Sequence, residues 1–169
     1  GLGTVRADVL TEVAMEMHEK HPNKRLVVHY FQPHAPCIGN RDGTLRDDLD
    51  NDIGPGDNLR EGLTTYEEVW SAYKENLLYA LHYARNLSEE IGGKTVYSAD
   101  HGELMGERLW PFPIRGYAHP SNLHHPKLIN VPWATETIGD RREITRGETS
   151  EHDFDDEKVE DRLKQLGYK

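Results

Sequence analysis

A short stretch at residues 95–103 constrains the fold of this chain more than any other. A β-branched run there ends in a carboxylate, an imidazole and a glycine, which are Asp100, His101 and Gly102. Runs of this kind are typical of strands that deliver metal ligands to the carboxyl edge of a parallel sheet. Side chains alternate along a strand, so Asp100 and His101 reach one ion only if the chain turns sharply. Gly102 permits that turn because it lacks a Cβ.

The first third of the chain predicts a helix, a strand and a loop. An apolar side chain at every fourth position favours a helix from Thr4 to about Lys20, with its stripe formed by Val5, Val9, Val13 and Met17. Residues 26–31 are apolar and end at prolines, so we expect a buried strand there. Residues 39–64 are rich in Gly, Asp, Asn and Arg, which predicts a long surface loop.

The middle of the chain predicts a long helix and a second strand. Thr65 and Glu68 have the spacing of a capping box, and the helix they open is expected to end near Ile91, before two glycines. Its predicted buried face consists of Trp70, Tyr73, Leu77, Leu81 and Ala84. A strand follows at residues 94–98. The order helix, strand, helix, strand predicts an α/β fold with a mostly parallel sheet and helices on both faces. The family resemblance described below implies that this fold is incomplete at the N-terminus.

The last third is divided at Gly139. Residues 102–133 hold five of the nine prolines and are predicted to form an irregular, shaped loop, after which residues 131–133 return to the sheet edge. We assign residues 1–138 to one domain, and the family resemblance described below implies that it is part of a catalytic domain. Residues 139–169 are polar and acidic, and are interpreted as a C-terminal extension with a short terminal helix.

Composition limits the partners of the chain. The formal net charge of −10 argues against a nucleic-acid backbone as partner. No apolar run approaches the roughly 20 residues that a membrane span needs. Only 8 of the 20 basic residues are lysines, which fits both a salt-tolerant (halophilic) source and ordinary acidic solubility. The chain has a single cysteine, Cys37, which excludes an internal disulfide. The cellular location therefore stays open between cytoplasm and cell surface, and the sequence does not indicate an oligomeric state.

Several segments together resemble one enzyme family. They are residues 32–36, 70–77, 98–107, 117–120, 130–133 and 162–168. In this order they resemble the later part of archaeal and bacterial sulfatase-like proteins, in the sulfatase branch of the alkaline phosphatase superfamily. Members of that family carry an earlier strand with metal-binding Asp and a nucleophile, and nothing before residue 25 is similar to it. The resemblance therefore implies that this chain acts as part of a longer protein and is inactive alone.

The resemblance also implies an activity and a set of site residues. The activity is metal-dependent hydrolysis of sulfate esters, with an anionic sulfate or phosphate ester as substrate and calcium, manganese, magnesium or zinc as cofactor. Asp100 and His101 match the metal pair of the family. His34 matches a histidine that faces the anionic oxygens of the ester, and His119 matches a later histidine that binds metal or substrate; both are candidate catalytic residues.

Other interpretations of the same residues stay open. Asp100 also suits a helix cap after a strand, and His34 also suits a loop histidine bonded to backbone. Glu103 is a candidate acceptor for the second nitrogen of a ligand histidine. On the same scaffold, a phosphodiesterase, a phosphonate hydrolase or a phospho-head-group transferase is an alternative. A non-catalytic metal-binding module is the alternative from outside the enzymes.

Overall fold

The computed structural model describes residues 4–38 and 54–147. In this part the chain forms four helices and four strands. In chain order they are α1 (Ala7–Lys20), α2 (Pro55–Arg60), α3 (Tyr66–Ile91), β1 (Gly93–Ser98), β2 (Leu104–Leu109), β3 (Ile114–Ala118), α4 (Pro126–Ile129) and β4 (Trp133–Ile138). None of these helices is long and apolar enough to cross a membrane.

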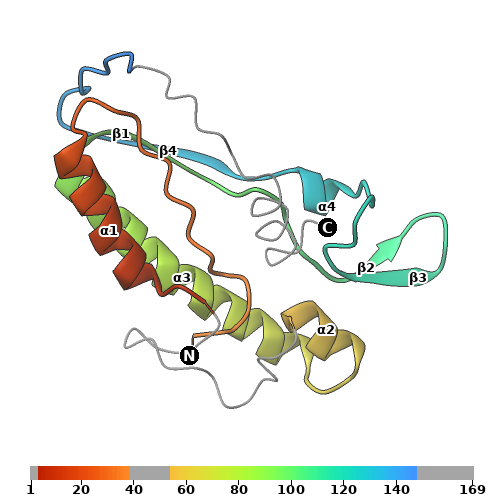
Figure 1. Cartoon of the computed structure of the whole chain (residues 1–169). Coiled ribbons are helices and arrows are strands. Elements are labelled where there is room, and N and C mark those ends of the chain that lie inside the picture. Colours follow the sequence, from red (N-terminus) through yellow and green to blue (C-terminus); the bar gives the residue numbers. More distant parts are fainter. Residues whose placement is uncertain (1–3, 39–53, 148–169) are drawn as a thin grey trace, which may run out of the picture.

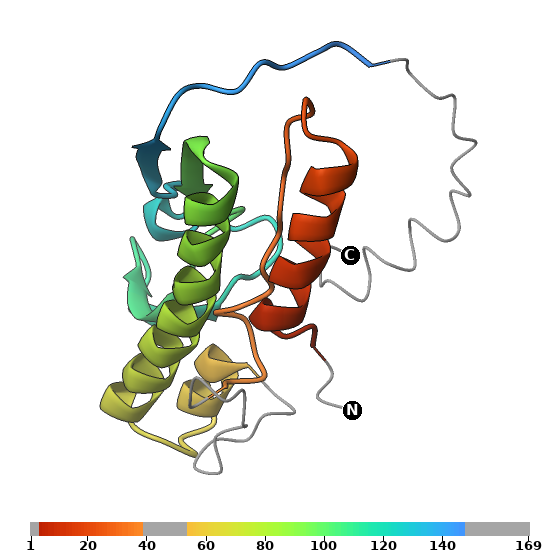
Figure 2. The ribbon, with the colours of Figure 1, turned by 90° about the vertical axis from the view of Figure 1, so that its left-hand side faces the viewer.

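The helices α1 and α3 lie side by side and run in the same direction (Figures 1 and 2). At their contact, two alanines pack with one tyrosine and one isoleucine in a buried cluster, which consists of Ala7, Ile38, Tyr79 and Ala80. Because alanine lacks a long side chain, it lets two helix backbones approach closely. This contact explains which face of each helix is buried.

The ends of both helices, the start of α3 and the capping box are as predicted, but α1 begins at Ala7 with Arg6 as its N-cap and not at Thr4. The predicted buried face of α1 is wrong, and that of α3 is wrong in part, since Tyr73, Leu77 and Ala84 are half-buried. The capping box between Thr65 and Glu68 is complete. On α1 the stripe of Val5, Val9, Val13 and Met17 is exposed, and the buried residues are Ala7, Thr11 and Ala14. On α3 the buried residues include Val69, Ala72, Asn76, Tyr79 and Ala80, whereas Trp70 and Leu81 are exposed. Alanines are buried on both helices, and the periodicity of large apolar residues does not predict this.

The predicted parallel sheet is wrong. Within residues 4–38 and 54–147, the strands form two separate antiparallel pairs, β1 with β4 and β2 with β3. The hairpin β2–β3 and the helix α4 lie between β1 and β4 along the chain, and they bring β4 back antiparallel, with Gly93 opposite Ile138. The alternation of helices and strands indicates a parallel sheet only if successive strands pair with each other, and here they do not.

The predicted strand at residues 26–31, which the parallel sheet required, is absent. The segment is extended, and its side chains alternate between half-buried and exposed, but it belongs to none of the described strands. Val27 is 92 % exposed, so this is not a buried strand. One side of the segment rests on α1 instead, where the Tyr30 hydroxyl is 2.7 Å from the Thr11 hydroxyl. The segment therefore contacts the helix α1 and does not pair with a neighbouring strand.

Two loop predictions also need correction. Residues 102–133 are not irregular throughout, because they contain β2, β3 and α4. The expected loop at residues 39–64 contains α2, while its residues 39–53 lie outside the described residues. Trp133 begins β4, as the predicted return to a sheet edge required. The predicted terminal helix falls within residues 148–169, which also lie outside the described part.

Candidate functional site

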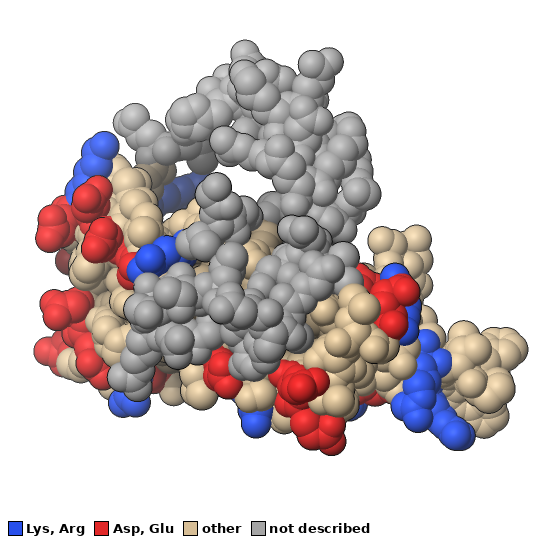
Figure 3. Space-filling view, turned by 90° about the horizontal axis from the view of Figure 1, so that it is seen from below, with Lys and Arg blue, Asp and Glu red and all other residues tan. Residues whose placement is uncertain are grey.

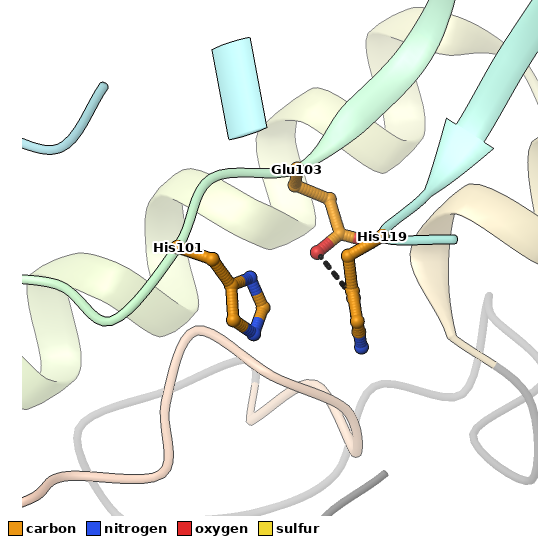
Figure 4. A group of neighbouring side chains, drawn as sticks. All are labelled: His101, Glu103 and His119. Carbon is orange, nitrogen blue, oxygen red and sulfur yellow. Dashed lines mark hydrogen bonds and ion pairs between the residues drawn. The ribbon is translucent and has the colours of Figure 1, made fainter. Parts of the chain in front are cut away.

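Three side chains with metal-ligating atoms meet beside the hairpin β2–β3. They are His101, Glu103 and His119, which we call the three-donor cluster (Figure 4). One ligand atom from each lies within 4.8 Å of the others. Glu103 Oε2 is 3.2 Å from His119 Nδ1, and the ring centres of His101 and His119 are 4.4 Å apart. The two rings and the carboxylate thus surround one small space.

Strand pairing explains why Glu103 and His119 are neighbours. Leu104, the first residue of β2, lies opposite Ala118, the last residue of β3. The residues just outside this pair, Glu103 and His119, therefore leave the open end of the hairpin together. They are 16 positions apart in the sequence, so their proximity depends on the register of the hairpin.

Two glycines hold the backbone on either side of the cluster. The amide of Gly102 donates to the Leu128 carbonyl over 2.9 Å, and a Cβ at this position would collide with the Lys127 carbonyl oxygen. A Cβ on Gly56 of α2 would come within 2.6 Å of the Ala118 amide nitrogen. Both positions are close backbone approaches that only glycine allows. Gly102 thus docks the His101 segment on α4, and Gly56 docks α2 on the end of β3.

Asp100 lies at the edge of the cluster. Its Oδ1 accepts from the backbone amide of the next residue, His101, over 2.9 Å. Its Oδ2 is 3.8 Å from His101 Nε2 and 3.7 Å from His29 Nε2. No helix begins here, so Asp100 is not a helix cap, and its carboxylate lies next to the imidazole of its predicted metal partner, His101.

His34 approaches the cluster from a different part of the chain. Its ring centre is 6.2 Å from that of His119 and 4.8 Å from that of Phe31. The loop that carries it is anchored by Asn76, a fully buried residue of α3. The Asn76 amide nitrogen donates to the carbonyls of residues 33, 34 and 36 over 3.0–3.4 Å, and its Oδ1 accepts from the Ile38 amide over 3.2 Å. One side chain thus fixes the whole turn.

The three histidines share one hydrogen-bonding pattern. In each, Nδ1 is near an oxygen: the Ala35 carbonyl for His34, the Gly102 carbonyl for His101, and the Glu103 carboxylate for His119. A carbonyl oxygen or an ionised carboxylate only accepts, so we infer that Nδ1 carries the hydrogen in all three rings. Nε2 is then the ring atom that can bind a metal ion, which is the usual arrangement of ligand histidines.

Negative charge dominates the electrostatics of the cluster. The hydrogen bond to Glu103 raises the pKa of His119, against the opposing effect of partial burial, and the charges of Glu103 and Asp100 add to the increase. Burial raises the pKa of Tyr73, and the same two carboxylates raise it further. The negative charges of Glu103 and Asp100 thus raise the pKa values of both His119 and Tyr73. This negative charge favours a bound cation.

An open groove begins at Glu103 and runs along α3. It has a volume of about 610 Å³, in the range of small-molecule sites. Its aromatic wall comes from Tyr66, Trp70 and Tyr73, and its polar wall includes Glu103, Glu107 and Lys127. The Lys127 ammonium donates to Glu107 over 2.7 Å, so this cation is already paired. The groove therefore offers space for an organic group beside the cluster.

A further histidine, His125, has a structural role. His125 Nδ1 accepts from the Lys127 amide and caps α4. Sequence reasoning missed Asn76 and Tyr73 as parts of the site. A signal for Asn76 existed, since it is a polar residue four positions from both Ala72 and Ala80, on one helix face.

Comparisons with known proteins add no assignment. No protein-family model matches the chain, and neither a curated protein nor a solved structure does.

Proposed function

We propose that this chain contributes the metal site of a hydrolase that cleaves sulfate esters, as part of a longer protein. The observation that carries the proposal is the meeting of His101, Glu103 and His119, with Asp100 and His34 beside them. They come from three places in the sequence, which are residues 100–103, His34 and His119, and the fold brings them together. The resemblance to sulfatase-like proteins supplies the reaction class.

The donor set fits a divalent cation. Two imidazoles and one carboxylate are the ligands of many catalytic zinc sites and also suit manganese. We assign His101, Glu103 and His119 as the residues that would hold the ion, with Asp100 as a further oxygen donor at the edge. A bound divalent ion would polarise the ester and stabilise the negative charge that develops on its oxygens.

The protein's own groups have separate roles in this proposal. His34 Nε2, once protonated, would give its proton to the leaving oxygen of the ester, since its Nδ1 is held by the Ala35 carbonyl 2.7 Å away. Glu103 would hold the His119 ring in a fixed orientation. The groove along α3 would receive the organic part of the ester. No described residue is assigned as the nucleophile.

The first experiment measures metal binding. Titration calorimetry with Mn²⁺ and Zn²⁺ on the 169-residue chain should give about one bound ion, and His101→Ala or His119→Ala should weaken binding by roughly 100-fold, as expected for loss of a ligand. His124→Ala is the matched control, because it removes an exposed histidine in the same loop region. Equal binding by wild type and both ligand variants would remove the site from this position.

The second experiment tests the reaction. Release of sulfate and of phosphate from nitrophenyl esters should be measured with any coding sequence that precedes Gly1 included. Metal-dependent sulfate release that His34→Ala lowers by roughly 100-fold supports the proposal. Phosphate release alone favours the phosphoesterase alternative. Metal binding without either activity favours a non-catalytic module.

A further inference from the structure

The tip of the hairpin β2–β3 exposes a compact group of large apolar side chains. Trp110, Phe112 and Ile114 are 86 %, 64 % and 55 % exposed, and they lie within five consecutive residues. The hairpin extends to one end of the molecule, away from α1 and the C-terminal half of α3 (Figure 1). Isolated exposed apolar residues are common, but a projecting group of them marks a contact surface.

Two arginines stand directly behind this tip. Arg108 and Arg115 are opposite each other in the register of β2 and β3, and both are exposed. Arg115 donates to the Gly106 carbonyl over 2.7 Å; within residues 4–38 and 54–147, neither guanidinium pairs with a carboxylate. Like charges directly across a strand pair oppose each other. Figure 3 shows basic atoms beside the tan projection at this end of the molecule.

We propose that this tip docks on a membrane surface that contains anionic lipid. Trp110, Phe112 and Ile114 enter the boundary between head groups and acyl chains, where tryptophan is favoured. Arg108 and Arg115 then meet lipid phosphates, which fit the planar fork of a guanidinium and offset the repulsion between the two arginines. No metal or substrate is part of this inference, so it stands apart from the proposed hydrolase.

The dimensions of the tip favour a lipid surface over a folded protein partner. Only Leu109 and Ile114 separate the arginines from the four-residue turn, which places them roughly 3–7 Å behind it at the rise of a strand. This distance matches the shallow insertion of interfacial segments, about 5–10 Å. With a net charge of −10, the rest of the chain is repelled by an anionic surface, so the tip is the part that approaches.

The experiment is co-sedimentation of the full chain with vesicles. Equimolar phosphatidylcholine and phosphatidylglycerol vesicles should bind it at low salt, and phosphatidylcholine alone should bind it much less. Arg108→Glu/Arg115→Glu should lower binding by more than about tenfold, since one arginine near an anionic surface contributes roughly fivefold. The matched control is Arg141→Glu/Arg146→Glu, which makes the same charge change at two other exposed arginines.

A second set of variants separates insertion from charge attraction. Trp110→Ala should weaken vesicle binding more than Trp133→Ala, although Trp133 is also 74 % exposed. With Trp70 and Trp133 replaced by phenylalanine, the fluorescence of Trp110 should shift to shorter wavelength on vesicles, as it leaves water. Circular dichroism checks that each variant is folded.

Three results would overturn the proposal. The first is an equal loss of binding in the tip variants and their controls. The second is an unchanged Trp110 spectrum on vesicles that bind the protein. The third is binding of polyglutamate through Arg108 and Arg115 with no binding to vesicles, which would assign the tip to an acidic protein.

Discussion

The two halves of α3 are held by different kinds of contact. Toward its C-terminal half, Tyr79 and Ala80 pack on α1 in a buried cluster that also contains Ala7 and Ile38. Toward its N-terminal half, Val69 and Ala72 pack on Cys37 and Met105, which come from a loop and from the hairpin. The first half is a helix–helix contact, and the second joins the helix to the segments that carry the candidate site.

This difference shows where the site obtains its rigidity. The helix–helix half depends on apolar fit and adds one polar group, in which Asp8 accepts from Arg6 and from the Tyr79 hydroxyl. The site half depends on the buried amide of Asn76, which bonds four backbone groups of the His34 loop. The backbone N–H and C=O groups of a buried loop need hydrogen-bond partners from elsewhere, whereas those inside a helix bond to one another.

The largest effect is therefore expected at Asn76. Asn76→Ala leaves several buried backbone groups without partners, so the free energy of unfolding should fall by about 3 kcal/mol. Denaturant unfolding measures this change. Asn86→Ala, at an exposed position of the same helix, is the control and should change stability by less than about 0.5 kcal/mol. A similar small effect at Asn76 would show that the loop does not depend on it.

A neighbouring pair on α1 tests which face of that helix is buried. Ala14 is 4 % exposed and Val13 is 49 % exposed. Ala14→Lys forces a long charged side chain into a buried position of α1 and should lower the unfolding free energy by about 2 kcal/mol. Val13→Lys should change it by less than about 0.5 kcal/mol in thermal or denaturant unfolding. The reverse order would restore the face that the apolar periodicity favours.

The smallest effect is expected from the polar group of the helix–helix half. The hydrogen bond from Arg6 holds the pKa of Asp8 below its ordinary value, against the opposing effect of burial. The folded chain thus binds this proton less readily than the unfolded chain, whose carboxyl titrates near about pH 4. The stabilisation is present above that pH and is lost as the pH falls through the lower folded-state value.

Asp8→Asn removes this pH dependence. The variant should be less stable than wild type at neutral pH, and the difference between them should shrink on acidification, as measured by denaturant unfolding across pH. Glu16→Gln, an exposed carboxyl on the same helix, is the control. A difference that stays constant down to the lowest pH would show that Asp8 titrates normally.

The candidate site was partly visible in the sequence, for an identifiable reason. Asp100 and His101 are adjacent, so their proximity required only a local turn. The resemblance to sulfatase-like proteins indicated His34 and His119, and their rings are neighbours in the structure. Glu103 was expected only as an acceptor, and the bond to His119 Nδ1 places it in that position. Its membership of the three-donor cluster depends on the register Leu104 opposite Ala118, which no local pattern gives.

The sequence by itself determined the local structure: where α1 and α3 end, the capping box, and the strand that follows the two glycines. These features depend on bonds between residues at most a few positions apart, so the local sequence is sufficient. The tertiary structure alone decided the partners. The antiparallel pairing of β1 with β4, the burial of alanines in place of the valine stripe, and the meeting of His101, Glu103 and His119 each join distant residues. Such choices are made by competition among packing arrangements of similar free energy, which periodicity cannot rank.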